Sequence, residues 1–129
     1  MPEVIPYLLY EDAASALEFL ARAFGFHETA RHGSEGRVAH AEMKIGDERI
    51  MLGQPAEGFR NPKHVGANTT LMYIYIDDVD NHCVRARDAG AEIVDEPTDQ
   101  EYGDRHYHAR DPEGHDWYFA QQARVPAEA

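Results

Sequence analysis

The chain repeats one order of predicted elements twice, and this repeat limits the folds that its 129 residues can adopt. Each half predicts a strand, a helix and three further strands, from apolar residues that alternate in the strands and recur every three or four positions in the helices. Asp12 and Asp78 are placed to cap the two helices, and Gly25 and Gly90 are placed to end them. We therefore predict an α+β fold of two βαβββ modules in tandem.

A stretch rich in proline and glycine separates the two halves. It has no periodic apolar pattern, which indicates a linker. Because a module of this size cannot bury a complete core alone, we expect one domain over residues 1–129. Each module should form a curved mixed sheet with one main helix, and the two sheets should close around a shared cleft. The boundaries that we predict are 3–53 for module one, 54–68 for the linker and 69–122 for module two.

The charge balance narrows the classes of partner. Twelve Lys and Arg against 24 Asp and Glu give a net charge of −12, which argues against binding to nucleic acid or to an anionic membrane. The single cysteine, Cys83, excludes a disulfide within the chain. No stretch is long and apolar enough to span a membrane, and the N-terminus has no basic segment followed by an apolar run, so we expect a cytoplasmic protein.

Two local motifs carry a resemblance to a known family. Residues 110–119 read RDPEGHDWYF, which resembles the D-P-[DE]-G-[NH] turn and final strand of the vicinal oxygen chelate superfamily. Residues 40–47 read HAEMKIGD and, with Ile50-Met51-Leu52, resemble the equivalent hairpin of the first half. The resemblance extends over roughly residues 3–122. It implies the fold of glyoxalase I, extradiol dioxygenases and bleomycin-resistance proteins, a fold that serves many activities.

Metal-using members of that superfamily hold one divalent ion with His, Gln or Glu side chains from the first and last strands of each half. Alignment by the helix starts and the D-P-E-G turn places these four positions at Val4, Met51, Leu71 and Tyr118. Alkyl and thioether groups do not bind a hard divalent ion, and a phenol is a poor ligand at neutral pH. We therefore expect no metal and no cofactor at the superfamily's position.

Strand alternation predicts which side chains line the cleft. If Met51 points inward, pairing across Gly46-Asp47 places Glu42 beside it. In the second half, Tyr118 should pair with His108, while Trp117 and Phe119 face the helix. This mixture of aromatic surface and a few polar groups suits an organic ligand. The predicted ligand-binding residues are His40, Glu42, Met51, Tyr73, Tyr75, His106, His108 and Tyr118.

Two sharper interpretations of the same residues remain open. The four donors His40, Glu42, His106 and His108 could hold a metal at a displaced position. Alternatively, His40, Glu42 and His108 could act as general acids and bases, because imidazole titrates near neutral pH. In a structural interpretation, these groups are partly solvated and hydrogen-bonded to the tyrosines.

These patterns lead to two functional hypotheses. The first is a metal-free, bleomycin-resistance-like binding protein that sequesters a small aromatic or cationic organic molecule, for which the net charge of −12 is weak support. The second is a lyase, isomerase or dioxygenase that uses the displaced metal or the acid–base residues. The resemblance also implies a homodimer, because metal-free relatives often build two clefts across the subunit interface.

Overall fold

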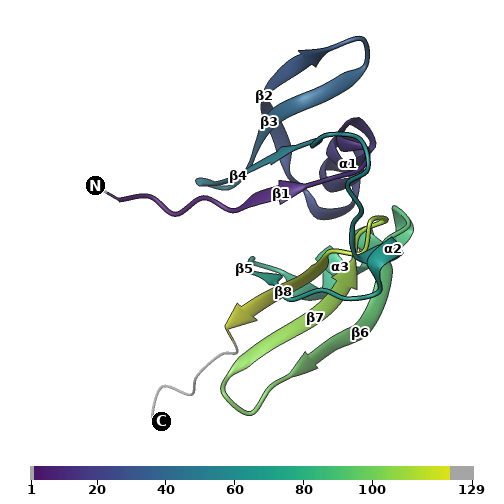
Figure 1. Cartoon of the computed structure of the whole chain (residues 1–129). Helices are drawn as coiled ribbons and strands as arrows, with labels where there is room; N and C mark the ends of the chain where they lie inside the picture. The colour runs from purple at the N-terminus through teal and green to yellow at the C-terminus, as the bar shows by residue number, and fades with distance from the viewer. Residues whose placement is uncertain (1, 123–129) are drawn as a thin grey trace. The chain divides into compact units, whose positions relative to one another are not determined.

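The computed structural model describes residues 2–122, which form parts of two compact units, residues 1–67 and 68–129. Each unit holds a four-stranded mixed sheet and a main helix (Figure 1). The α+β class and the tandem order of two similar modules are therefore confirmed. A cleft shared by the two sheets stays a prediction.

Unit 1 has its strands in the order β1-β4-β3-β2, with β1 parallel to β4 and the other pairs antiparallel. The two-residue turn at Gly46-Asp47 joins β3 to β4, as the sequence predicts. The elements of unit 1 are β1 (Tyr7–Leu9), α1 (Ala13–Phe19), a π-helical turn η1 (Leu20–Phe24), β2 (His27–Ser34), β3 (Arg37–Ile45), β4 (Glu48–Gly53) and α2 (Pro62–Val65).

The first helix begins and ends at the residues that the sequence indicates. The Asp12 carboxylate accepts a hydrogen bond from the backbone N–H of Ser15 at 3.1 Å, and Gly25 ends the helix with φ at 86°. Only glycine adopts this left-handed conformation without steric cost. The sequence pattern does not reveal that the last turn, η1, widens into a π-helix.

Unit 2 repeats this plan with the strand order β5-β8-β7-β6, in which β5 is parallel to β8. Asp78 caps its helix by accepting from the Asn81 backbone N–H at 3.2 Å. The elements of unit 2 are β5 (Leu71–Tyr75), α3 (Val79–Asp88), β6 (Glu92–Asp99), β7 (Asp104–Arg110) and β8 (Asp116–Gln122).

The cores lie on the helix side of each sheet. In unit 1, Ala41, Met43 and Leu52 are fully buried, and so is Leu20 on η1. In unit 2, Trp117 and Phe119 are fully buried, as predicted, and the Phe119 ring lies 4.2 Å from that of His82 on α3. With one strand face committed to the core, alternation leaves the side chains of the opposite face for other roles.

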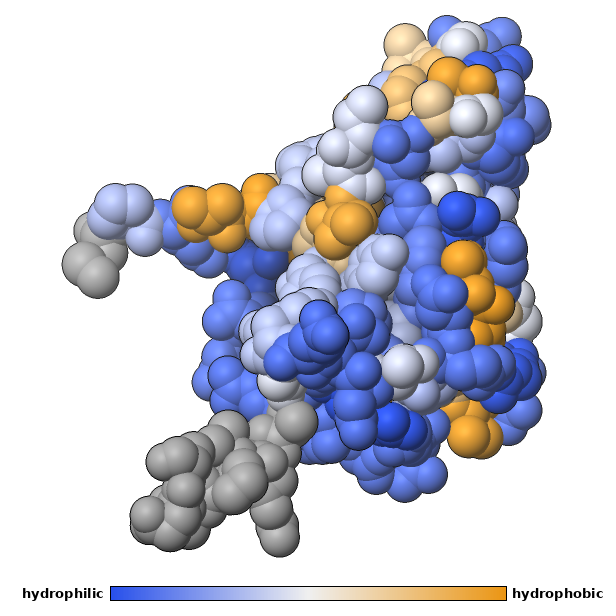
Figure 2. All heavy atoms as spheres, turned by 90° about the horizontal axis from the view of Figure 1, so that it is seen from below, coloured by the Kyte–Doolittle hydropathy of each residue, from blue (hydrophilic) through white to orange (hydrophobic). Residues whose placement is uncertain are grey.

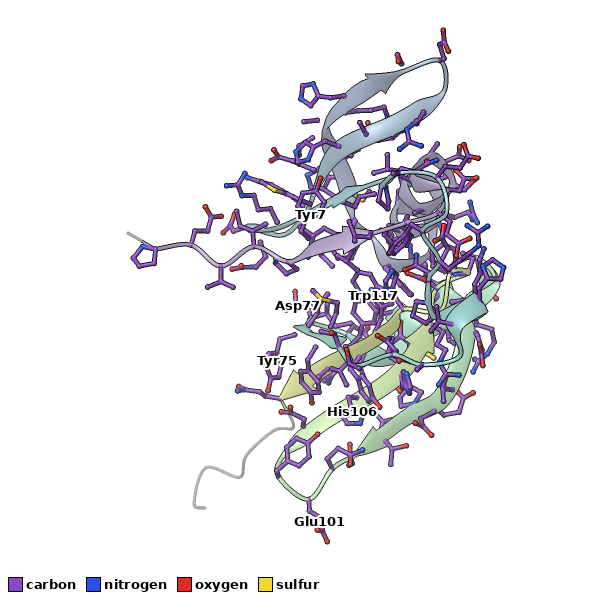
Figure 3. All side chains as sticks on the ribbon, in the orientation of Figure 1. Tyr7, Tyr75, Asp77, Glu101, His106 and Trp117 are labelled. Atoms are coloured by element: carbon purple, nitrogen blue, oxygen red, sulfur yellow. The ribbon has the colours of Figure 1, made fainter. Side chains whose placement is uncertain are left out.

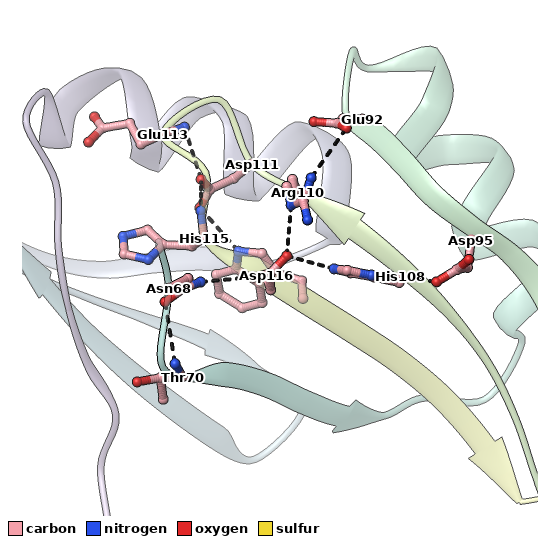
Figure 4. Close-up of polar contacts among 11 residues, drawn as sticks. Asn68, Thr70, Glu92, Asp95, His108, Arg110, Asp111, Glu113, His115 and Asp116 are labelled. Carbon is pink, nitrogen blue, oxygen red and sulfur yellow. Dashed lines mark hydrogen bonds and ion pairs between the residues drawn. The ribbon is translucent and has the colours of Figure 1, made fainter. Parts of the chain in front are cut away.

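The D-P-E-G turn between β7 and β8 is held by the buried carboxylate of Asp111 (Figure 4). This carboxylate accepts from the backbone N–H groups of Glu113 at 3.0 Å and His115 at 3.1 Å, and from the indole N–H of Trp117 at 3.1 Å. The motif is therefore structural: Asp111 satisfies three donors, two of them from buried residues, and fixes the register of the last hairpin.

Residues 54–67 belong to unit 1 rather than forming a free connection. The side chain of Asn61 is buried and donates to the Leu9 carbonyl at 2.8 Å, while its backbone N–H donates to the Glu11 carboxylate at 2.8 Å. The predicted linker thus contains the short helix α2 and is anchored to the end of β1.

The start of the chain differs from the sequence prediction. The first strand is shorter than the apolar run at residues 4–10 predicts, so Val4 lies before β1 and is 94% exposed.

On the face shown in Figure 2, hydrophilic residues predominate and hydrophobic ones form separate small groups. No helix within residues 2–122 is long and apolar enough to cross a membrane.

Candidate functional site

Strand register brings the five predicted residues of unit 2 together on the sheet face opposite α3. Tyr118 on β8 pairs with His108 on β7, as predicted, and with Tyr73 on the other side. Tyr75 and His106 lie one pleat along their strands, and both pair with Ala120. Figure 3 labels Tyr75 and His106 on this sheet.

The rings of these residues form one continuous cluster. Tyr118 stacks on His108, with ring centroids 4.3 Å apart and an interplanar angle of 12°. Its ring lies 6.0 Å from that of Tyr73, nearly parallel to it, and meets His106 edge-on at 5.2 Å. We call the set Tyr73, Tyr75, Tyr102, His106, His108 and Tyr118 the aromatic face. Such offset and edge-to-face contacts fix the rings in place.

Beneath two of the tyrosines lies a carboxylate that the sequence argument missed. Asp104, at the start of β7, is only 6% exposed. It accepts hydrogen bonds from the hydroxyls of Tyr73 at 2.7 Å and Tyr75 at 2.8 Å. Burying a carboxylate is costly unless hydrogen-bond donors replace the lost water, and two phenols donate to Asp104 here.

This arrangement keeps both phenols protonated. Burial, together with hydrogen bonds to Tyr102 and Asp104, raises the pKa of Tyr73. The hydrogen bond to Asp104 is the main cause of the raised pKa of Tyr75. Since each hydroxyl hydrogen points to Asp104, the phenol oxygens face the remaining neighbours as acceptors.

His108 belongs to an ionic cluster at the other end of the aromatic face (Figure 4). Its Nε2 lies 2.7 Å from Asp116, and its Nδ1 lies 3.6 Å from Asp95. Asp116 also accepts from Arg110 at 2.9 Å and from Asn68 at 3.0 Å. Burial acts to raise the pKa of Asp116, but these hydrogen bonds outweigh it and lower the pKa. With a carboxylate at each ring nitrogen, His108 is oriented as a fixed stacking partner for Tyr118.

The three predicted residues of unit 1, His40, Glu42 and Met51, lie on the corresponding face of the other sheet. The predicted pairing of Glu42 with Met51 is confirmed. The Tyr7 hydroxyl lies 2.9 Å from Nδ1 of His40. The carboxylate of Glu42 is 2.9 Å from Arg49, which also binds Glu3 through two hydrogen bonds. This face is therefore a chain of partly exposed ionic contacts with one thioether.

The residues at the four expected ligand positions do not fit the divalent metal ion that the family resemblance implies. Val4 lies outside β1, and Leu71 and Met51 carry no oxygen or nitrogen donor. Tyr118 has a pKa raised mainly by burial, which keeps its phenol neutral. Among residues 2–122, no group of three His, Cys, Asp or Glu side chains is arranged to hold a metal ion.

The residues that sequence reasoning missed are Tyr102, Asp104, Arg110 and Asp116. Alternation along β7 places residues 104, 106, 108 and 110 on one face, and this signal could have added Asp104 and Arg110 to the set. Tyr102 was not predictable in this way, because it lies in the turn before β7. Its hydroxyl lies 3.3 Å from that of Tyr73 and 3.2 Å from Nδ1 of His106.

Comparison with known proteins agrees with this architecture. An uncharacterised protein of Mycobacterium bovis is 33% identical over 95% of this chain and 85% of its own length. The crystal structure of TioX from Micromonospora sp. ML1 is similar, with 32% identity, a TM-score of 0.75 and coverage of 98% of this chain and 100% of that chain. A glyoxalase/bleomycin resistance protein/dioxygenase from Nocardioides shares the fold, at 16% identity and a TM-score of 0.72, over 98% of this chain and 87% of its own.

The family assignment rests on the sequence as well as on the fold. The sequence model of the Glyoxalase/Bleomycin resistance protein/Dioxygenase superfamily matches residues 5–119, which include both sheets up to β8. That range also contains the D-P-E-G turn and the aromatic face. The chain belongs to the glyoxalase/bleomycin resistance protein/dioxygenase superfamily.

Proposed function

We propose that this chain is a metal-free binding protein that takes up a small aromatic cation on the aromatic face of unit 2. The observation that carries the proposal is the buried carboxylate of Asp104, held by the hydroxyls of two half-exposed tyrosines. A carboxylate in this place is costly for a purely structural role, since apolar packing would stabilise the sheet at least as well. Its negative charge makes the surrounding rings a better site for a cation.

The exposed rings supply the contact area. Tyr73, Tyr75 and Tyr102 are 38%, 57% and 67% exposed, so each offers ring surface to a ligand. The face of a phenol ring attracts a cation through its quadrupole, and a flat ligand gains dispersion contacts as well. Arg110, which follows His106 and His108 on β7, is already paired with Asp116. The excess of acidic residues adds long-range attraction for a cation.

Isothermal titration calorimetry tests the proposal with proflavine, a planar aromatic cation, and naphthalene-2-sulfonate, a planar aromatic anion. We expect saturable binding of proflavine, and weaker binding of the anion to the same protein. The Asp104→Asn variant, which keeps the size of the side chain, should bind proflavine about fivefold more weakly because the charge is removed. Equal affinity for the two probes, or an unchanged affinity in the variant, would contradict the proposal.

We also propose that the chain forms a homodimer, as the superfamily resemblance implies. Tyr7, Leu9 and Leu71 are exposed large hydrophobic side chains on strands at the edges of the two sheets, and such groups favour association. Light scattering coupled to size-exclusion chromatography measures the mass directly. A mass twice that of the chain supports the proposal, and the mass of one chain over a range of concentrations contradicts it.

A further inference from the structure

A cavity of about 450 Å³ lies within unit 1, bordered by residues 54–60 and by the ends of the first strands. It involves none of the residues of the aromatic face. Its walls combine apolar and charged side chains from separate parts of the unit. The residues that line it are Tyr10, Glu11, Arg37, Gln54, Pro55, Ala56, Glu57, Gly58, Phe59, Arg60 and His64.

The loop over this cavity is held by polar anchors at both ends. At one end, a guanidinium nitrogen of Arg37 donates to the carbonyls of Gln54 at 2.8 Å and Pro55 at 2.6 Å, and the Gln54 side chain accepts from the Ala13 backbone N–H. At the other end, Asn61 is fixed to Leu9 and Glu11. Gly58, with φ at 98°, provides the turn between them. These hydrogen bonds fix the loop of residues 54–60 beside the cavity.

The charged side chains around the cavity differ in their partners, and Glu57 on its wall forms no ion pair within residues 2–122. The Glu11 carboxylate accepts from Asn61 and lies 2.9 Å from His64, and the hydrogen bond from the Asn61 backbone lowers its pKa. Arg37 and Arg60, in contrast, have only backbone carbonyl partners and no carboxylate partner within residues 2–122. Five other arginines form ion pairs with carboxylates: Arg31, Arg49, Arg87, Arg105 and Arg110.

Arg37 and Arg60 have no acidic partner among residues 2–122, although the full sequence has 24 acidic and 12 basic residues. Both line the same cavity, with Phe59, Pro55 and the buried ring of Tyr10 beside them. A guanidinium group binds carboxylates through paired, charge-assisted hydrogen bonds, and apolar walls bind the body of an organic molecule. We propose that this cavity is a second ligand site, specific for a small organic carboxylate with an apolar body.

A titration of the full chain followed by ¹H–¹⁵N NMR tests this proposal, with phenylacetate as the probe and phenethylamine as the probe of opposite charge. We expect saturable shifts on adding phenylacetate, located at residues 54–64 and at Arg37. The Arg60→Gln variant should bind phenylacetate about tenfold more weakly, and Arg60→Lys should recover part of the loss. Arg60 bonds only to its neighbour Phe59, so its replacement leaves the loop anchors intact.

The matched control is Tyr73→Ala, which alters the aromatic face and should leave phenylacetate binding unchanged. This control distinguishes the cavity of unit 1 from the aromatic face. Loss of proflavine binding with phenylacetate binding intact would affect only the proposed function, and loss of phenylacetate binding with proflavine binding intact would affect only the second site. Phenethylamine binding at residues 54–64 as tight as that of phenylacetate would overturn the proposal. So would phenylacetate affinity that Arg60→Gln leaves unchanged.

Discussion

The two units place different chemistry on corresponding positions of the same scaffold. Tyr7 pairs with Met51 in unit 1, and Tyr73 pairs with Tyr118 in unit 2. Both tyrosines bond to Nδ1 of a histidine on the next strand but one, at 2.9 Å for Tyr7 and 3.1 Å for Tyr73. The tyrosine–histidine contact is therefore common to both sheets and does not by itself mark a binding site.

The neighbouring ion pair is also common, but its polarity is reversed. In unit 1, the acid is Glu42 on β3 and the base is Arg49 on β4, 2.9 Å apart. In unit 2, the basic residue is His108 on β7, which forms an ion pair when its imidazole is protonated, and the acid is Asp116 on β8, 2.7 Å away. A cross-strand pair works in either direction, because its Coulomb energy does not depend on which strand carries which sign.

The difference that points to function lies two residues before the shared histidine. Unit 1 has Val38 at this position, 3% exposed, and unit 2 has Asp104, 6% exposed. The thioether of Met51 likewise corresponds to the ring of Tyr118. Unit 1 therefore forms its tyrosine–histidine contact without a buried carboxylate two residues before the histidine. The buried carboxylate is thus not needed for the tyrosine–histidine contact, and it is the feature that we propose serves a ligand.

The largest expected effect concerns the last hairpin of each unit. Asp111→Ala removes the acceptor for the Trp117 indole and two backbone N–H groups, and should lower the free energy of unfolding by about 3 kcal/mol. Asp47→Ala, in the corresponding exposed turn of unit 1, should change it by less than about 0.5 kcal/mol. Urea denaturation followed by the fluorescence of Trp117, the single tryptophan, measures unit 2 directly. Equal losses would contradict a structural role for the turn in unit 2.

The second largest expected effect concerns Asp116 in unit 2 and Glu42 in unit 1, which should contribute unequally to the free energy of unfolding. Asp116→Asn weakens hydrogen bonds from three partners around a buried histidine and should cost about 2 kcal/mol, whereas Glu42→Gln on the more exposed pair should cost about 0.5 kcal/mol. The lowered pKa of Asp116 means that its contribution is present above the unfolded-state pKa and is lost as the pH falls through the folded-state pKa. Stability measured between pH 6 and pH 3 should therefore fall less steeply in Asp116→Asn than in the unaltered chain.

Replacement of the corresponding tyrosines tests which sheet binds the aromatic cation. Tyr73→Ala should reduce the affinity for proflavine about tenfold, because it removes a ring and a hydroxyl bonded to Asp104. Tyr7→Ala, which removes the equivalent ring of unit 1, should leave the affinity within twofold (about 0.4 kcal/mol). Calorimetric titration of both variants measures the two affinities. A larger loss of proflavine affinity in Tyr7→Ala would place the binding site on the sheet of unit 1 and contradict the prediction.

The smallest expected effect is electrostatic. Asp104→Asn should lower the pKa of Tyr75, and to a lesser extent that of Tyr73, toward the ordinary value, as measured by tyrosinate absorbance during alkaline titration. Because both phenols have raised pKa values in the folded chain, their stabilising effect is present below the unfolded-state pKa of about 10 and is lost as the pH rises. The variant should therefore lose less stability above pH ~10. An unchanged tyrosine titration would show that Asp104 does not raise the pKa of these two phenols.

Much of this architecture follows from the sequence, because it depends on local signals. Asp12 and Asp78 cap the helices, and alternation places Trp117 and Phe119 on the core side. The site was harder to predict. Alternation along β7 could have indicated Asp104, but Asp116 resembles an ordinary surface acid in the sequence, and only strand register brings it to His108. The anchoring of residues 54–61 depends on contacts distant in the sequence, such as that of Asn61 with Leu9, which no periodic pattern reveals.

A ¹H–¹⁵N NMR titration of the full chain with proflavine locates the proposed binding surface residue by residue. We expect saturable shifts concentrated in β5, β7 and β8, strongest near Tyr73, Asp104 and Tyr118. In Asp104→Asn, we expect smaller shifts in the same segments at equal probe concentration. Shifts concentrated in β1, β3 and β4 of unit 1, or no saturable shifts at all, would contradict the claim that the aromatic face of unit 2 binds the ligand.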